Sequence, residues 1–224
     1  MMEKMVITID GPAGAGKTTV SRGLADRLGY RYIDTGALYR GVALAARKAG
    51  VAADDDEGLE AICQGLRLQF VRNASGCRLY SGDEDIEGQI RTPEISMLAS
   101  AVSARPVVRR FLLAVQRQFA REKGVVFEGR DMGTVVFPEA EVKFFLDAPL
   151  TIRARRRHDE FAGRSHQTLE DVLKDMARRD HNDQTRSVAP LRPADDAIVI
   201  DSANLSPEEV VNQMVEAVEA CKTP

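Results

Sequence analysis

Glycines and a lysine near the start of the chain form the first group whose types and spacing indicate chemistry. Residues 11–18 read Gly-Pro-Ala-Gly-Ala-Gly-Lys-Thr and match the pattern G-x-x-x-x-G-K-[ST]. Glycines let the backbone wrap around phosphates so that successive N–H groups point inward, and a following helix N-terminus adds partial positive charge. Lys17 would reach the β- and γ-phosphates, and the Thr18 hydroxyl would bind Mg²⁺. We therefore predict a site for the phosphates of a nucleotide, made of Gly11, Pro12, Ala13, Gly14, Ala15, Gly16, Lys17, Thr18 and Thr19.

The residues around this loop predict the elements that the motif requires. Residues 5–9 are an apolar run typical of a buried parallel strand, and Val20, Leu24 and Leu28 recur at helical spacing before Gly29. A strand before the loop and a helix after it favour a phosphate-binding loop over a chance glycine-rich turn.

An acidic residue later in the chain is the candidate for a second ligand of the metal ion. Glu128 follows the apolar residues 125–127, at the predicted end of another buried strand. A carboxylate there would hold Mg²⁺ directly or through water. The alternative is a solvent-facing residue just past a strand.

Arginines supply the remaining candidates. With a formal net charge of −3 there is no global basic bias, so anionic ligands must meet local clusters. Arginine suits forked recognition of phosphate and neutralises charge on a transferring phosphoryl group. The alternative for many of them is a surface salt bridge. The positions concerned are Arg40, Arg109, Arg130, Arg153, Arg155, Arg156, Arg157, Arg164, Arg178, Arg179 and Arg186.

The order of the predicted elements indicates an α/β fold with a parallel sheet core. Further strands are predicted at residues 32–34, 124–128, 142–146 and 197–200. Residues 66–86 alternate in hydrophobicity around a turn, which predicts a small antiparallel insert. Residues 152–183 read as helical, rich in arginine and interrupted near residue 163.

Composition narrows the function class. Aromatic residues make up 5% of the chain and tryptophan is absent, which disfavours an RNA-binding module that stacks bases. No apolar run has the length of a membrane span. The three cysteines form no metal-binding or paired spacing, and we interpret each as a small packing residue in a reducing compartment. We expect a cytoplasmic protein that binds neither nucleic acid nor membrane.

Three ordered motifs after the loop resemble the bacterial-type cytidylate kinase family. Residues 34–40 read Asp-Thr-Gly-Ala-Leu-Tyr-Arg, residues 129–138 read Gly-Arg-Asp-Met-Gly-Thr-Val-Val-Phe-Pro, and residues 186–191 read Arg-Ser-Val-Ala-Pro-Leu. The resemblance runs nearly end to end. It implies a P-loop NTPase fold with three α/β/α layers, a small antiparallel insert that binds the nucleoside monophosphate, and an arginine-rich helical lid.

The resemblance also implies roles. Ser100, Arg109 and Asp131 would face cytosine, whose amino group is a donor that uracil lacks and that an aspartate accepts. The acceptor phosphate would meet Thr35, Arg40, Arg130 and Arg186, and the sugar would meet Arg179 and Asp183. Arg157 of the lid would contact ATP, and the catalytic residues would be Lys17, Arg130 and Arg186. Glu128 departs from the family pattern, which usually has aspartate there.

These expectations define one kinase unit over residues 1–224. Its core would be residues 1–62, 104–152 and 184–224, with the insert at 63–103 and the lid with its flanking helices at 153–183. We expect a monomer that uses ATP, Mg²⁺ and CMP or dCMP. The alternatives are a related kinase acting on UMP, AMP or a non-nucleotide such as shikimate, and a non-catalytic nucleotide-binding module.

Overall fold

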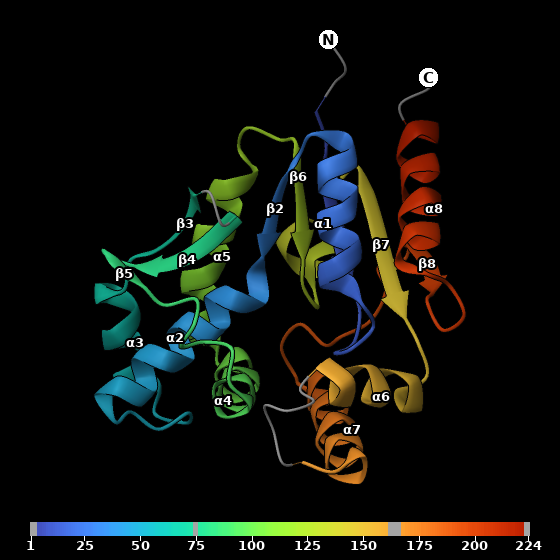
Figure 1. Cartoon of the computed structure of the whole chain (residues 1–224). Helices are drawn as coiled ribbons and strands as arrows, with labels where there is room; N and C mark the ends of the chain where they lie inside the picture. Colours follow the sequence, from blue (N-terminus) through green and yellow to red (C-terminus); the bar gives the residue numbers. More distant parts are fainter. Residues whose placement is uncertain (1–3, 74–75, 161–166, 222–224) are drawn as a thin grey trace. The chain divides into compact units, whose positions relative to one another are not determined.

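The computed structural model describes residues 4–73, 76–160 and 167–221 (Figure 1). Its contacts divide the chain into two units. We call Met1–Ile33 together with Glu122–Pro224 the sheet unit, and Asp34–Arg121 the hairpin unit. Strand β2 (Arg31–Asp34) ends at the boundary, because the Asp34 side chain caps the helix that follows.

A five-stranded sheet with the order β2-β6-β1-β7-β8 forms the centre of the sheet unit. The bounds are β1 Val6–Asp10, β6 Val125–Glu128, β7 Val142–Asp147 and β8 Ile198–Asp201. Strand β1 runs parallel to β6 and β7, and β7 runs parallel to β8. Because β1 and β6 are buried along their whole length, they read as nearly continuous apolar runs. The predicted strands are therefore confirmed, and the carboxyl ends of β1, β6 and β7 share one edge.

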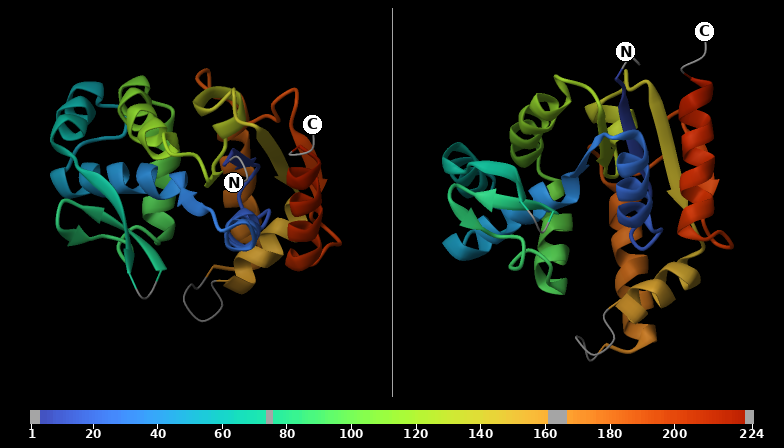
Figure 2. Two further views of the ribbon diagram at one scale, coloured as in Figure 1. Left: turned by 90° about the horizontal axis from the view of Figure 1, so that it is seen from above. Right: turned by 45° about the horizontal axis from the view of Figure 1, so that its top comes forward.

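The described residues of the sheet unit form the α-helices α1 (Lys17–Leu28), α6 (Leu150–Glu160), α7 (Leu169–Thr185) and α8 (Pro207–Ala220). Helix α1 packs against α8, and α6 packs against α7 (Figure 2). Gly29 ends α1 in the left-handed conformation, and capping boxes begin α7 and α8. Residues 161–166 of the predicted lid lie outside the described residues.

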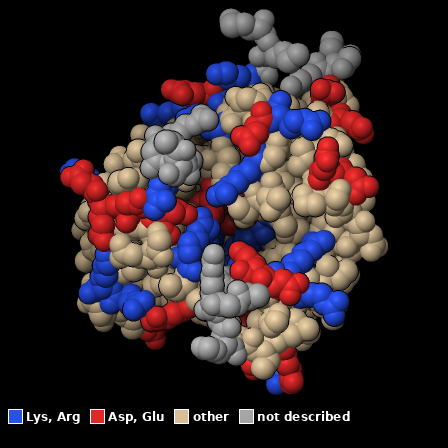
Figure 3. All heavy atoms as spheres, in the orientation of Figure 1, with Lys and Arg blue, Asp and Glu red and all other residues tan. Residues whose placement is uncertain are grey.

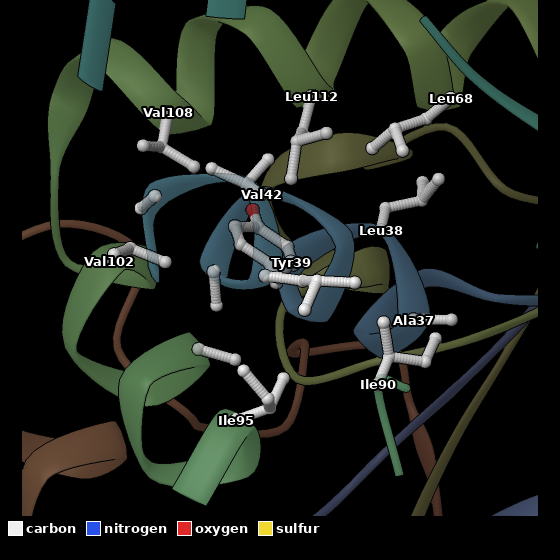
Figure 4. Packing of buried hydrophobic residues seen from close by; sticks show 14 of the residues in the cluster. Ala37, Leu38, Tyr39, Val42, Leu68, Ile90, Ile95, Val102, Val108 and Leu112 are labelled. Carbon is white, nitrogen blue, oxygen red and sulfur yellow. The ribbon is translucent and has the colours of Figure 1, made fainter. Parts of the chain in front are cut away.

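The described residues of the hairpin unit form a small antiparallel sheet and several helices. Its strands are β3 (Leu68–Asn73), β4 (Gly76–Ser81) and β5 (Glu84–Asp85), and its helices are α2 (Thr35–Ala49), α3 (Asp56–Gly65), α4 (Pro93–Ser103) and α5 (Pro106–Ala120). Leu38, Val42 and Leu112 pack in its fully buried core (Figure 4). The unit is larger than the predicted insert of residues 63–103, because α2 contacts β4 and α5 contacts α3.

Two elements were not predicted from the sequence. Helix α3 begins at the cap Asp55, but it buries only Leu59 and Cys63, too few residues for a clear periodic pattern. The π-helical turn η1 (Met132–Val136) follows β6. The interpretation of every cysteine as a packing residue is wrong, because Cys63 is buried while Cys77 and Cys221 are exposed.

Figure 3 shows one face of the molecule, on which neither basic nor acidic side chains predominate. Lysine and arginine side chains interleave there with aspartate and glutamate (Figure 3). Among residues 4–73, 76–160 and 167–221, no helix has the length and apolarity that crossing a membrane requires.

Candidate active site

The phosphate loop joins β1 to α1 by a path that only glycine allows at two points. Gly11 has φ +144°, and a Cβ atom there would lie 2.0 Å from the carbonyl oxygen of Leu146 in β7. Gly14 has φ +75°, and its Cβ would lie 2.9 Å from the carbonyl oxygen of Arg153 in α6. The glycines predicted from the motif therefore let β7 and α6 approach the loop backbone directly.

Lys17 begins α1 and is buried, with 4% of its surface exposed. Its Nζ donates to the carbonyl oxygen of Pro12 at 2.7 Å, so the ammonium group is held against the loop. Burial, and next the nearby charge of Arg130, lower the pKa of Lys17 to about 7. Phosphate oxygens would favour the charged form of this lysine.

Thr18 and Glu128 meet as expected for two oxygen ligands of one cation. The Thr18 hydroxyl donates to Glu128 Oε1 at 3.0 Å, which leaves the lone pairs of the hydroxyl oxygen available. Within the described residues no cluster of three or more His, Cys, Asp or Glu forms a metal cage of its own. Mg²⁺ is commonly held by one or two protein oxygens together with phosphates and water. The two side chains therefore fit Mg²⁺ bound with a nucleotide.

The segment after β6 brings together five of the predicted acceptor-site residues. Arg186 Nη2 lies 3.4 Å from Asp131 Oδ1, and both side chains are less than a tenth exposed. Arg130 Nε lies 3.2 Å from Asp183 Oδ2, and Arg179 Nε lies 4.0 Å from the same oxygen. Since each arginine faces a carboxylate, the guanidinium groups are held in defined orientations.

The remaining predicted acceptor-site residues belong to the hairpin unit. Thr35 is the first residue of α2, and Arg40 Nη2 donates to Asp34 Oδ2 at 2.7 Å. Burial alone would raise the pKa of Asp34, but Arg40 and Arg91 hold it below its ordinary value.

Two further predicted residues of this unit, Arg109 and Ser100, each contact Ser103. Arg109 Nη1 donates to the carbonyl oxygen of Ser103 at 3.2 Å, and its guanidinium lies 5.8 Å from the ring centre of Tyr39. Ser100 lies on α4, half-buried, and its carbonyl oxygen accepts from the Ser103 hydroxyl.

The arginines of α6 differ in their surroundings. Arg153 is buried, donates to the carbonyl oxygens of Ala13 at 3.0 Å and Ala148 at 2.7 Å, and pairs with Asp180 at 2.7 Å. It therefore ties the phosphate loop to α6 and α7, a contact that the sequence did not reveal. Arg157 pairs with Glu160 at 3.0 Å and is partly exposed. The predicted lid residue Arg164 lies outside the described residues.

Asp10 is a second residue that sequence reasoning missed. It ends β1, is buried, and accepts the N–H groups of Met132 at 2.9 Å and Gly133 at 2.8 Å. It therefore holds the turn that follows Asp131. A carboxylate at the end of an apolar strand, directly before the loop, was the available signal. Burial raises the pKa of Asp10 to about 7, although both N–H groups act in the opposite direction.

This pKa predicts a pH dependence of stability. A carboxyl whose pKa is higher in the folded than in the unfolded protein stabilises the fold at low pH, and this contribution is lost as pH rises through about 7. We expect the free energy of unfolding of wild type minus that of Asp10→Asn to decrease between about pH 4 and pH 7, the interval between the ordinary and the raised pKa. Urea unfolding at several pH values measures it, and a constant or growing difference would contradict the raised pKa.

Comparison with known proteins agrees with this geometry. A family model described as cytidylate kinase matches residues 7–220. A cytidylate kinase of Geobacter sulfurreducens is 54% identical over 211 residues, covering 94% of this chain and 91% of its own. A cytidylate kinase of Geobacter sp. strain M21 is 50% identical over 215 residues, covering 96% of this chain and 92% of its own.

Solved structures agree at the level of the fold. A gluconokinase of Sinorhizobium meliloti 1021 aligns with a TM-score of 0.53 at 14% identity, covering 98% of this chain and 94% of its own. Together with the parallel sheet and the small antiparallel sheet, this likeness confirms the predicted P-loop α/β fold. The chain belongs to the cytidylate kinase family and is an enzyme, a nucleoside monophosphate kinase.

Proposed function

We propose that this kinase transfers the terminal phosphoryl group of ATP to CMP and dCMP, giving ADP with CDP or dCDP. The observation that carries the proposal is the short segment of residues 128–131. Glu128 at its start contacts Thr18 of the phosphate loop, while Arg130 and Asp131 at its end pair with Asp183 and Arg186. One segment at the end of β6 thus joins the residues proposed for the donor phosphates to those proposed for the acceptor.

The donor side uses the phosphate loop. Residues 11–19 would bind the phosphates of ATP through backbone N–H groups and Lys17, and Arg157 would approach them from the lid. When bound, Mg²⁺ supplies charge neutralisation on the phosphates, with Thr18 and Glu128 as the protein groups that hold it.

The residues proposed for the acceptor are those that the resemblance to the family implies. Thr35, Arg40, Arg130 and Arg186 would bind the CMP phosphate, Arg179 and Asp183 the sugar, and Ser100, Arg109 and Asp131 the base. Asp131 accepts from the cytosine amino group, which uracil replaces with a carbonyl oxygen.

The reaction needs little covalent chemistry from the protein. An oxygen of the CMP phosphate is already anionic and attacks the γ-phosphorus in line, so no general base is required. Lys17, Arg130 and Arg186 orient the reacting groups and neutralise charge in the transition state. The lid region, residues 153–183, closes over the bound nucleotides and excludes water, which would otherwise accept the phosphoryl group.

We also propose the cellular setting and the division of the chain. The enzyme works as a cytoplasmic monomer on free nucleotides, without nucleic acid or membrane partners. Its core comprises residues 1–62, 104–152 and 184–224, with residues 63–103 as the acceptor-binding insert and 153–183 as the lid region.

A coupled assay of ADP release with ATP and Mg²⁺ tests the reaction. With CMP, dCMP, UMP, AMP and GMP offered separately, we expect strong turnover of CMP and dCMP, weak turnover of UMP and almost none of the purine nucleotides. Turnover of UMP alone would select a related kinase. No turnover with any of them would point to a non-nucleotide acceptor or a non-catalytic module.

Asp131 decides the base preference in this proposal. Because its removal deletes a charged acceptor for the cytosine amino group, we expect Asp131→Ala to lower the CMP-to-UMP ratio of kcat/KM by about tenfold to a hundredfold. The ratio is informative because loss of the Arg186 partner would slow both substrates equally. An unchanged ratio would show that Asp131 supports Arg186 without reading the base.

Lys17 acts on the transferring group in this proposal and leaves CMP binding to other residues. We expect Lys17→Met to lower kcat by about a thousandfold, or ~4 kcal/mol, because such contacts stabilise the charge of the transition state. Calorimetry should find the CMP affinity within about threefold of wild type, since each subsite supplies its own contacts. Lys48→Met is the matched control, because Lys48 is an exposed lysine that pairs with Glu84. Loss of CMP affinity with Lys17 would contradict separate subsites.

A further inference from the structure

Glu128 has a second partner that the proposed mechanism does not use. The hydroxyl of Tyr32 donates to Glu128 Oε2 at 2.5 Å, while Thr18 donates to Oε1 at 3.0 Å. Tyr32 lies on β2, the neighbour of β6 in the sheet. The two oxygens of one carboxylate are therefore held from two different elements.

Helix α1 closes this arrangement. Arg22 lies one helical turn after Thr18, and its guanidinium lies 5.3 Å from the ring centre of Tyr32. A cation over an aromatic face is attracted to the ring and keeps it in place. These contacts link four residues of the sheet unit, Thr18, Arg22, Tyr32 and Glu128, into what we call the Tyr32 network.

The length of the Glu128 side chain explains why a second donor matters. Glutamate has one more rotatable bond than aspartate, so placing its carboxylate beside Thr18 requires the loss of more rotamer freedom. The Tyr32 hydroxyl donates to Oε2, the other oxygen of the carboxylate, and this fixes the group without occupying Oε1. Partners of this kind commonly change metal affinity by about tenfold to a hundredfold.

We propose that Tyr32 is a positioning residue for Glu128, and that its hydroxyl allows a glutamate to serve at the magnesium site of this chain. The inference rests on the proposed function, which assigns Thr18 and Glu128 to the metal. It goes beyond that function because the Tyr32 network makes the affinity for the metal–nucleotide complex depend on a strand residue outside the phosphate loop.

The test removes one hydroxyl group. Tyr32→Phe keeps the aromatic ring and its contact with Arg22, but it deletes the donor to Glu128. Calorimetry with ADP, with and without Mn²⁺ as the probe metal, gives the factor by which the metal tightens ADP binding. We expect this factor to fall by about tenfold, with ADP affinity in the absence of metal unchanged.

Tyr30→Phe is the matched control. Tyr30 lies two residues away, and its hydroxyl accepts from the N–H of Met5 at 3.2 Å, so it makes a backbone contact in place of the carboxylate contact. The metal factor should stay at its wild-type value in this variant. An equal fall in both variants would assign the effect to lost tyrosine hydroxyls in general and overturn the proposal.

A double-mutant cycle with Glu128→Asp tests whether Tyr32 acts through Glu128. Shortening the side chain withdraws the carboxylate from the hydroxyl, so Tyr32→Phe should change the metal factor by less than about twofold in that background. The same tenfold loss in both backgrounds, or no loss in wild type, would overturn the inference.

Glu128→Gln separates this inference from the proposed function. If this variant lowers the metal factor while Tyr32→Phe does not, the Tyr32 inference fails and the metal site stands. If Glu128→Gln leaves the factor unchanged, the assignment of Glu128 to the metal fails as well.

Discussion

The close approach of two backbone segments to the phosphate loop is the constraint on which the site depends. Gly11 lies against the Leu146 carbonyl of β7, and Gly14 lies against the backbone of α6. No side chain fits at either point, so the loop is confined by rigid elements and not by its own residues. Arg153 extends this confinement, because it binds the Ala13 carbonyl and pairs with Asp180 of α7. The helices proposed as the lid region are thereby anchored at the loop they would cover.

Three arginines of the proposed acceptor site are paired with carboxylates. Arg186 with Asp131, Arg130 with Asp183 and Arg40 with Asp34 each place a guanidinium beside a carboxylate. A buried charge without a partner would be strongly destabilising, so these carboxylates stabilise the arginines and also orient them. A chain with a net charge of −3 can thus carry several arginines suited to anions without a broadly basic surface.

The carboxyl edge of the parallel sheet brings distant parts of the chain together. Asp10 at the end of β1 binds the turn after Asp131, and Glu128 at the end of β6 binds Thr18 at the start of α1. The proposed base-reading residue and the phosphate loop are therefore held by the same pair of adjacent strands. A shift in one strand would displace both.

The sequence by itself determined the phosphate loop, the order of the strands along the chain and the family, because local spacing and ordered motifs carry that information. It also assigned Thr18 and Glu128 to one metal ion, and the structure brings these two side chains within hydrogen-bond distance. Only the tertiary structure decided that Arg153 clamps the loop, that Asp10 holds the turn after Asp131, and that Tyr32 binds Glu128. The physical reason is that each of these contacts joins segments whose separation in sequence is large, and a side chain's partner depends on the packing that brings those segments together.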